Sequence, residues 1–150
     1  MNIKGIDYLN RKRTDNLIPQ IFRNDDIFFI SFSSFQQNNK ILSKQIRKYV
    51  LELLKNGNNI SITCIGGESY VFPMVMPQQF LKIYNYTNNL SIYNDTLFNQ
   101  KIYCKNKEIY TEIINYNTIN DLPFSNKLLI NLSRLNSNLL KVINNNKYSE

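Results

Sequence analysis

Hydrophobic positions along the chain change their period several times, and each change predicts an element. The run IFFISFSSF at 27–35 is aromatic and β-rich, which predicts a strand. Asn38 or Asn39 can cap a helix over 40–55, and Gly57 can end it in a left-handed conformation. Apolar residues recur there at intervals of three and four, which predicts one buried stripe made of Leu42, Ile46, Tyr49, Val50, Leu53 and Leu54.

Short β-rich runs follow this helix and are separated by connections. They are ISITCI at 60–65, FLKIYNY at 80–86, a pair around KIYC and EIYTEII, and KLLINL at 127–132. A second helix follows, capped by Asn136, with an apolar side made of Leu139, Leu140, Val142 and Ile143. This alternation predicts an α/β fold with an open, mostly parallel sheet over 27–150, preceded by an irregular or short-helix lead-in at 1–26.

Composition sets the size and the expected location of the domain. A chain of 150 residues that is 43% hydrophobic suffices for one globular core. MNIKGIDYLNRKR is basic but is not followed by an apolar core, so it does not read as a signal peptide. The pattern predicts no transmembrane segment, and we expect an intracellular, cytoplasmic protein with no membrane partner.

Several chemistries are disfavoured by the residue types that are present. The chain has no histidine, which removes imidazole metal sites and histidine-based acid–base or nucleophilic catalysis. Cys64 and Cys104 lie far apart without the spacing of a zinc or redox site, and we interpret them as buried free thiols. No metal is expected, since the acidic residues form no cluster beyond Asp25 and Asp26.

The net charge favours anionic partners. It is +7 with a pI near 9.4, which is typical of proteins that bind nucleic acid through phosphates. Within the first helix, a basic side is a candidate RNA contact, and the simpler alternative is a solvated helix face. This basic side comprises Lys40, Lys44, Arg47, Lys48 and Lys55.

Two adjacent glycines, Gly66 and Gly67, end the strand at 60–65. In an open parallel sheet the loop after the first strand is a usual cofactor contact, and glycine lets a ligand approach the backbone. The alternative is a tight turn with no ligand. The chain has neither a G-x-G-x-x-G pattern nor a P-loop, so NAD and NTP binding are not supported.

Three stretches, in order, resemble the RNA uracil-5-methyltransferase family, which uses S-adenosylmethionine on a Rossmann-like sheet. They are SSFQQNNKILSKQIRKYVLELL, ITCIGGESYVFP and LLINLSRLNSNLLKVINN. Phe35, Gln37 and Asn39 match the family's Phe-x-Gln-x-Asn stretch. The glycine loop matches in part through Gly66, Tyr70 and Pro73. The resemblance covers roughly 30 to 146 and implies a Rossmann-like, methyltransferase-type α/β sheet.

The resemblance also implies roles for particular residues in binding S-adenosylmethionine. Gln37 would contact the cofactor, and Gly66, Gly67 and Tyr70 would shape its pocket. Asn85, at the end of the second strand, would replace the carboxylate that binds the ribose hydroxyls. Other positions also depart from the family, namely Ile62, Glu68 and the stretch Asn131-Leu132-Ser133-Arg134.

The family's reaction requires a cysteine thiolate and a base taken out of its stack. That cysteine follows a later strand, which would begin where this chain ends, and neither Cys64 nor Cys104 can be assigned the role. The resemblance therefore implies a truncated or decayed S-adenosylmethionine-dependent RNA methyltransferase-like protein, a pseudoenzyme. It would still bind cofactor or RNA. The chain is also unusually rich in asparagine, which together with abundant Ile, Lys and Tyr indicates an AT-rich genome, and we expect a viral or parasite source.

Two other readings stay open. One is a non-enzymatic basic α/β interaction module that binds RNA, as a viral accessory or virion protein. The other is an active methyltransferase of another kind, for which Asn131 is the best catalytic candidate. An incomplete sheet would leave an unpaired edge, which a partner protein or a homo-oligomer would cover.

Overall fold

A computed structural model describes residues 17–21, 27–31, 34, 39–57, 60–67, 69, 72, 80–103, 107–132, 134 and 136–146. The elements, in chain order, are β1 (Leu17–Ile21), β2 (Ile27–Ser31), α1 (Lys40–Leu54), β3 (Ser61–Gly66), β4 (Lys82–Thr87), α3 (Leu90–Tyr103), β5 (Glu108–Ile113), β6 (Lys127–Asn131) and α4 (Ser137–Asn145).

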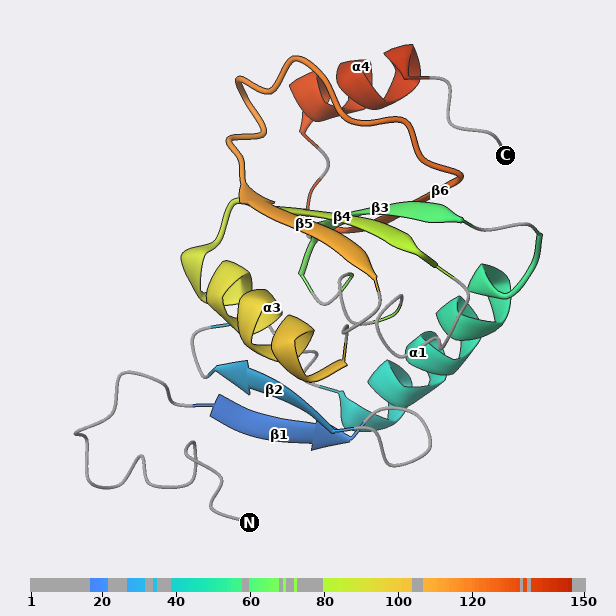
Figure 1. Ribbon diagram of the computed structural model, residues 1–150, viewed down its shortest axis with the longest axis vertical. Helices are drawn as coiled ribbons and strands as arrows, with labels where there is room; N and C mark the ends of the chain where they lie inside the picture. Colours follow the sequence, from blue (N-terminus) through green and yellow to red (C-terminus); the bar gives the residue numbers. More distant parts are fainter. Residues whose placement is uncertain are drawn as a thin grey trace.

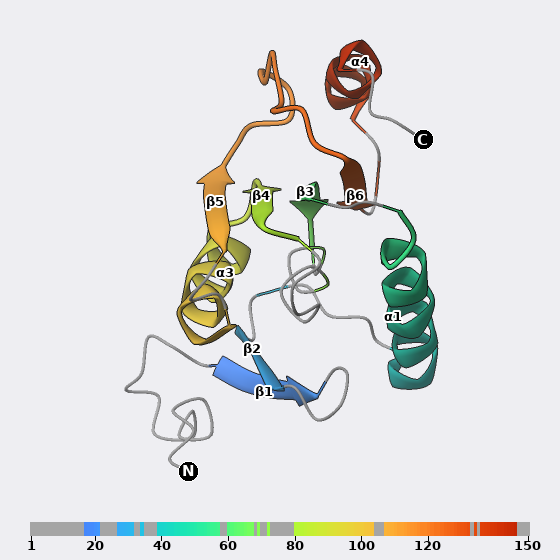
Figure 2. The ribbon, with the colours of Figure 1, turned by 45° about the vertical axis from the view of Figure 1, so that its right-hand side comes forward.

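Four strands form one parallel sheet in the order β5-β4-β3-β6. From β3 the chain steps outward to β4 and β5, and it then returns to the other side of β3 as β6 (Figures 1 and 2). This order creates a topological switch point between β3 and β6, where open α/β sheets bind their ligands. The predicted α/β class with a mostly parallel open sheet is confirmed.

β1 and β2 form a separate antiparallel hairpin. The prediction of an irregular or short-helix lead-in at 1–26 is therefore wrong for residues 17–21, because the partner strand β2 recruits them. The outer edge of β2 is closed by α3. There the Asn99 side chain accepts a hydrogen bond from the Phe29 backbone N–H (2.8 Å) and donates one to the Phe29 carbonyl (2.7 Å).

Apolar side chains cover both faces of the parallel sheet. On the face toward α1, α3 and the hairpin, the buried cluster is Phe28, Leu51, Leu54, Ile62, Cys64, Phe72, Phe80, Ile83 and Ile92. The opposite face lies under α4 and the connection 114–126 (Figure 2). Its buried residues are Ile65, Tyr116, Leu122, Leu139 and Val142.

Asparagine side chains hold the long connection 114–126 in place. Asn138, on α4, donates to the carbonyls of Tyr116 and Ile119 at 3.0 and 2.9 Å, and Asn146 donates to the carbonyl of Leu122 at 2.8 Å. These amides satisfy backbone carbonyls that no regular element pairs. Part of the unusual asparagine content therefore has a structural role.

The caps of α1 agree with the sequence, but its predicted buried stripe does not. Asn39 caps the start and accepts a hydrogen bond from the Leu42 N–H, and Gly57 has φ 89° beyond the end. Only Leu54 of the predicted stripe is buried, and Val50 is half-buried. The helix instead packs through Ser43, Leu51 and Leu54, which leaves the other four apolar residues exposed.

KIYC, predicted as a strand, forms the end of α3 as far as Tyr103. The spacing of apolar residues did not predict this helix, because its buried side chains include the polar residues Asp95, Thr96 and Asn99. Asn89 caps its start by accepting from the Ile92 N–H at 3.1 Å. EIYTEI forms the predicted strand as β5.

Candidate cofactor-binding site

The glycine turn lies at the carboxyl end of β3, beside the switch point between β3 and β6. Gly66 has φ 84°, a left-handed conformation that strongly favours glycine. The Ser69 hydroxyl donates to the Gly66 carbonyl at 2.8 Å and fixes the turn. The sheet therefore presents this turn where a ligand would bind.

The two glycines have different surroundings. A Cβ on Gly66 would overlap the Asn131 carbonyl oxygen and lie 2.5 Å from Leu132 Cδ2. The close approach of β3 and β6 therefore requires a residue without a Cβ at Gly66. A Cβ on Gly67 would lie 3.1 Å from Asn131 Nδ2. Because Gly67 is only half-buried, its backbone remains partly accessible beside this amide.

Asn85 does not end the second strand. β4 continues two residues further, to Thr87, and Asn85 is buried between the sheet and α3. Its amide donates to Thr111 Oγ1 at 3.3 Å. Asn85 and Gly66 line the same cavity, but this cavity is only about 10 Å³, room for one water molecule at most. The prediction that Asn85 lies at the end of the second strand is therefore wrong.

The strand-end position belongs to Asn88, which the sequence reading missed. Thr87 is buried and accepts a hydrogen bond from the Asn89 N–H at 3.1 Å, while Asn89 caps α3. The side chain between them, Asn88, is exposed at the carboxyl end of β4. An Asn-Asn pair before a helix is a capping signal, and it could have located the end of the strand.

The described residues offer no activated nucleophile at this edge. Cys64 is buried within β3, and desolvation raises the pKa of its thiol far above the ordinary value, so the thiolate is disfavoured. Burial likewise raises the pKa of the Tyr116 hydroxyl. Within the described ranges, the residues that directly follow the four strands are Gly67, Asn88, Ile114 and Leu132, none of them acidic.

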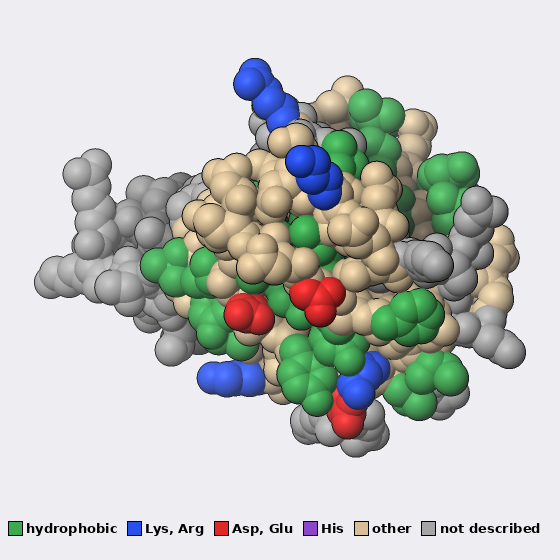
Figure 3. All heavy atoms as spheres, turned by 90° about the horizontal axis from the view of Figure 1, so that it is seen from above, with side chains coloured by type: hydrophobic (Ala, Val, Ile, Leu, Met, Phe, Trp, Pro, Cys, Tyr) green, Lys and Arg blue, Asp and Glu red, His purple; other side chains and the backbone are tan. Residues whose placement is uncertain are grey.

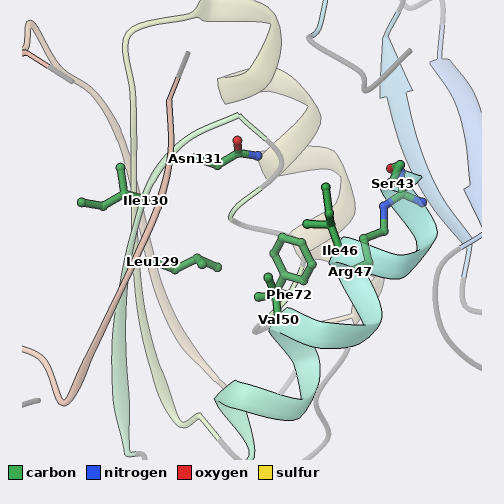
Figure 4. A pocket seen from close by; sticks show the side chains of 8 residues that line it. All are labelled: Ser43, Ile46, Arg47, Val50, Phe72, Leu129, Ile130 and Asn131. Atoms are coloured by element: carbon green, nitrogen blue, oxygen red, sulfur yellow. The ribbon is translucent and has the colours of Figure 1, made fainter. Parts of the chain in front are cut away.

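A groove of about 130 Å³ separates α1 from β6 (Figure 4). Leu129 and Asn131 of β6 point into it, whereas Ile130 points away. The residues on the α1 side are Ser43, Ile46, Arg47 and Val50, and Phe72 closes one part. Arg47, one of the predicted RNA contacts, is half-buried and lines this groove.

The other predicted site residues are placed only in part. Gln37 and Tyr70 lie outside the described residues, as does the side chain of Lys40. Lys44 and Lys48 are exposed on α1. The structure thus brings Gly66, Gly67 and Asn131 together and places the described lysines elsewhere.

The face seen from above mixes lysine or arginine with acidic side chains, with no large patch of one sign (Figure 3). Lys82 and Glu108 form an ion pair at 3.1 Å, and the neighbouring rings of Tyr84 and Tyr110 are stacked. In the part of the chain that the structure describes, no helix has the length and apolarity to cross a bilayer. The same part holds no cluster of three or more potential metal ligands from cysteine, aspartate and glutamate.

Comparison with known proteins identifies the type of fold. No protein-family model and no curated protein matches the chain. The structure is similar to that of the Pyrococcus abyssi tRNA (uracil-54, C5)-methyltransferase in complex with S-adenosyl-L-homocysteine, with a TM-score of 0.64 and 18% identity. The match covers 87% of this chain and 32% of the archaeal one. The chain therefore has a Rossmann-like, methyltransferase-type fold and spans about a third of that neighbour.

Proposed function

We propose that this protein is a diverged relative of the RNA uracil-5-methyltransferases that binds S-adenosylmethionine at the carboxyl ends of β3 and β4 and does not transfer the methyl group. One observation carries the proposal. The Gly66-Gly67 turn lies at the switch point of a parallel sheet whose fold is shared with an enzyme solved with S-adenosyl-L-homocysteine. The Phe35-x-Gln37-x-Asn39 stretch, which resembles a motif of that family, points to the same cofactor.

Each residue of the proposed site has a physical role. The Gly67 backbone would let the ligand approach without meeting a side chain. Asn88 would hydrogen-bond the ribose hydroxyls at the end of β4, a role that the sequence reading gave to Asn85. Gln37 would contact the cofactor as the resemblance implies. The cofactor, when bound, carries an activated methyl group on its sulfonium.

We infer the loss of methyl transfer from the groups that the described residues of the site offer. The family's reaction needs a thiolate that adds to the base, and Cys64 is buried with a raised thiol pKa. Asn131 is uncharged at any ordinary pH and cannot act as a general base. Binding therefore survives in this proposal while catalysis does not.

Calorimetric titration with S-adenosylmethionine and S-adenosylhomocysteine tests the proposal. We expect both to bind, and Gln37→Ala to weaken binding about tenfold, the effect of one lost hydrogen bond. Asn88→Asp should strengthen binding about fivefold, because a charged acceptor binds a hydroxyl more strongly than an amide does.

Asn144→Asp, an exposed change of the same charge on α4, is the matched control and should leave the affinity unchanged. Equal effects of the two aspartate variants would mean that net charge, not the strand end, governs binding. Absence of binding to the wild-type protein would contradict the proposal.

A second candidate function, RNA binding by a basic module, is favoured by one observation. Lys44 and Lys48 are exposed on one side of α1, and Lys55 is exposed directly after its end. With a single-stranded oligouridine probe, the double variant Lys44→Glu, Lys48→Glu should bind more weakly. Its logarithmic salt slope should fall by about 1.4, the share of two phosphate contacts on a single strand.

Lys101→Glu with Lys141→Glu, exposed lysines on α3 and α4, makes the same change in charge elsewhere. If this control lowers the affinity and the slope as much, the attraction is a general effect of net charge and α1 is not the RNA-binding face.

A further inference from the structure

The strongest surface anomaly of the molecule is an apolar stripe on α1. We call Leu42, Ile46, Tyr49 and Leu53 the α1 stripe. Their side chains are 50%, 44%, 63% and 48% exposed, although large apolar residues in one contiguous row are normally covered. Their spacing of four, three and four residues keeps them in one row along the helix.

The helix divides into three faces, because each residue turns the side chain by about 100°. Ser43, Leu51 and Leu54 face the protein interior and are buried. The exposed lysines Lys44 and Lys48 project from the side of the helix away from the stripe. The stripe therefore carries no lysine, and the positive charge of α1 points away from anything that packs on it.

We propose that the α1 stripe is the contact surface of a homodimer, in which α1 packs antiparallel on α1 of a second copy. The spacing of the stripe reads the same in both directions, so a two-fold axis between Ile46 and Tyr49 matches every apolar residue. Leu42 lies opposite Leu53 of the second copy, and Ile46 lies opposite Tyr49. Such self-complementarity is what an isologous two-fold interface requires.

Polar residues beside the stripe support the second copy as the occupant. Gln45 and Glu52 occupy the outer flank, at the positions that face each other across an antiparallel helix pair. Gln45 can then donate to the carboxylate of Glu52 in the second copy, with no like charges opposed. The antiparallel order also places opposite ends of the two helix dipoles together.

The expected dimer is weak, since one helix pair buries less area than a standard interface. Sedimentation velocity of the full chain should show a mass that rises from one copy to two as concentration increases. Tyr49→Glu places a charge at the centre of the contact and should abolish the rise. Ile102→Glu makes the same kind of change at an exposed residue of α3, and it should leave the dimer intact.

A mixing experiment tests the orientation. Leu42→Glu and Leu53→Lys should each weaken the homodimer. In either variant, a charged side chain lies opposite a leucine of the second copy at both ends of the contact. Mixed together, the two variants should recover dimer formation, since the antiparallel order pairs Glu at 42 with Lys at 53. A parallel pair would not bring these two positions together.

Circular dichroism must show that each variant remains folded. A wild-type chain that stays monomeric at its highest soluble concentration would overturn the proposal. The α1 stripe would then be a contact surface for a helix of a different protein. A dimer that Tyr49→Glu does not weaken would also overturn it. These outcomes are independent of cofactor binding, so a result that contradicts the dimer does not contradict the proposed function.

Discussion

Gly66→Ala is expected to destabilise the fold by about 2–5 kcal/mol, the largest effect of any substitution proposed for this chain. Two costs add. A residue with a Cβ is strained at φ 84°, and its Cβ would overlap the Asn131 carbonyl oxygen across the β3–β6 contact. Because a domain of this size has only about 5–15 kcal/mol of stability, much of it would be lost.

Urea denaturation followed by circular dichroism measures the change. Gly57→Ala is the matched control, because Gly57 has a similar φ of 89° but lies exposed beyond the end of α1. It should cost only the backbone strain, about 1 kcal/mol. If the two variants lose equal stability, the close contact between β3 and β6 is not what requires glycine at position 66.

Asp95→Ala should cost about 2–4 kcal/mol. The buried carboxylate of Asp95 accepts hydrogen bonds from the Ser31 N–H at 2.9 Å, the Ser31 hydroxyl at 3.1 Å and the Ser34 hydroxyl at 2.5 Å. Alanine would remove the acceptor of these three hydrogen bonds and would loosen α3 from the hairpin. Asp95→Asn keeps one acceptor oxygen and should cost less, which denaturation in urea can measure.

The same carboxyl group gives a pH dependence with a defined sign. Burial raises the pKa of Asp95 above its ordinary value of 3.8, and the serine hydrogen bonds only partly oppose this shift. The folded state therefore holds the proton to a higher pH than the unfolded state does. The contribution is fully present below 3.8 and is lost as the pH rises through the folded pKa. Relative to Asp95→Asn, the wild-type protein should lose stability over that window; a gain would contradict the assignment.

Elements with a strong apolar period or a clear cap could be predicted from the sequence. α1, β3, β4, β6 and α4 lie close to their predicted positions, and the caps at Asn39 and Asn136 are confirmed. α3 could not be predicted from apolar spacing, since polar side chains form much of its buried face. β1 depends on its pairing with β2, which no local pattern encodes.

The candidate site was predictable as a turn but not in its detail. Gly66 and Gly67 mark the end of β3 as predicted, with Gly66 as its last residue, because glycines mark such breaks locally. Asn85 lies two residues before the end of its strand, and the signal that marks this end is the Asn88-Asn89 pair, in which Asn89 caps α3. Periodicity also predicted that the α1 stripe would be buried, because it detects an apolar row without specifying what covers it.

The central claim is that S-adenosylmethionine or its product binds at the carboxyl ends of β3 and β4. Nuclear magnetic resonance of the ¹⁵N-labelled protein, titrated with S-adenosylhomocysteine, tests both the binding and its place. The amide signals of Gly66, Gly67 and Asn88 should shift in a saturable manner, while those of α4 stay unchanged. Unchanged spectra at saturating ligand, or shifts confined to the groove between α1 and β6, would contradict the account.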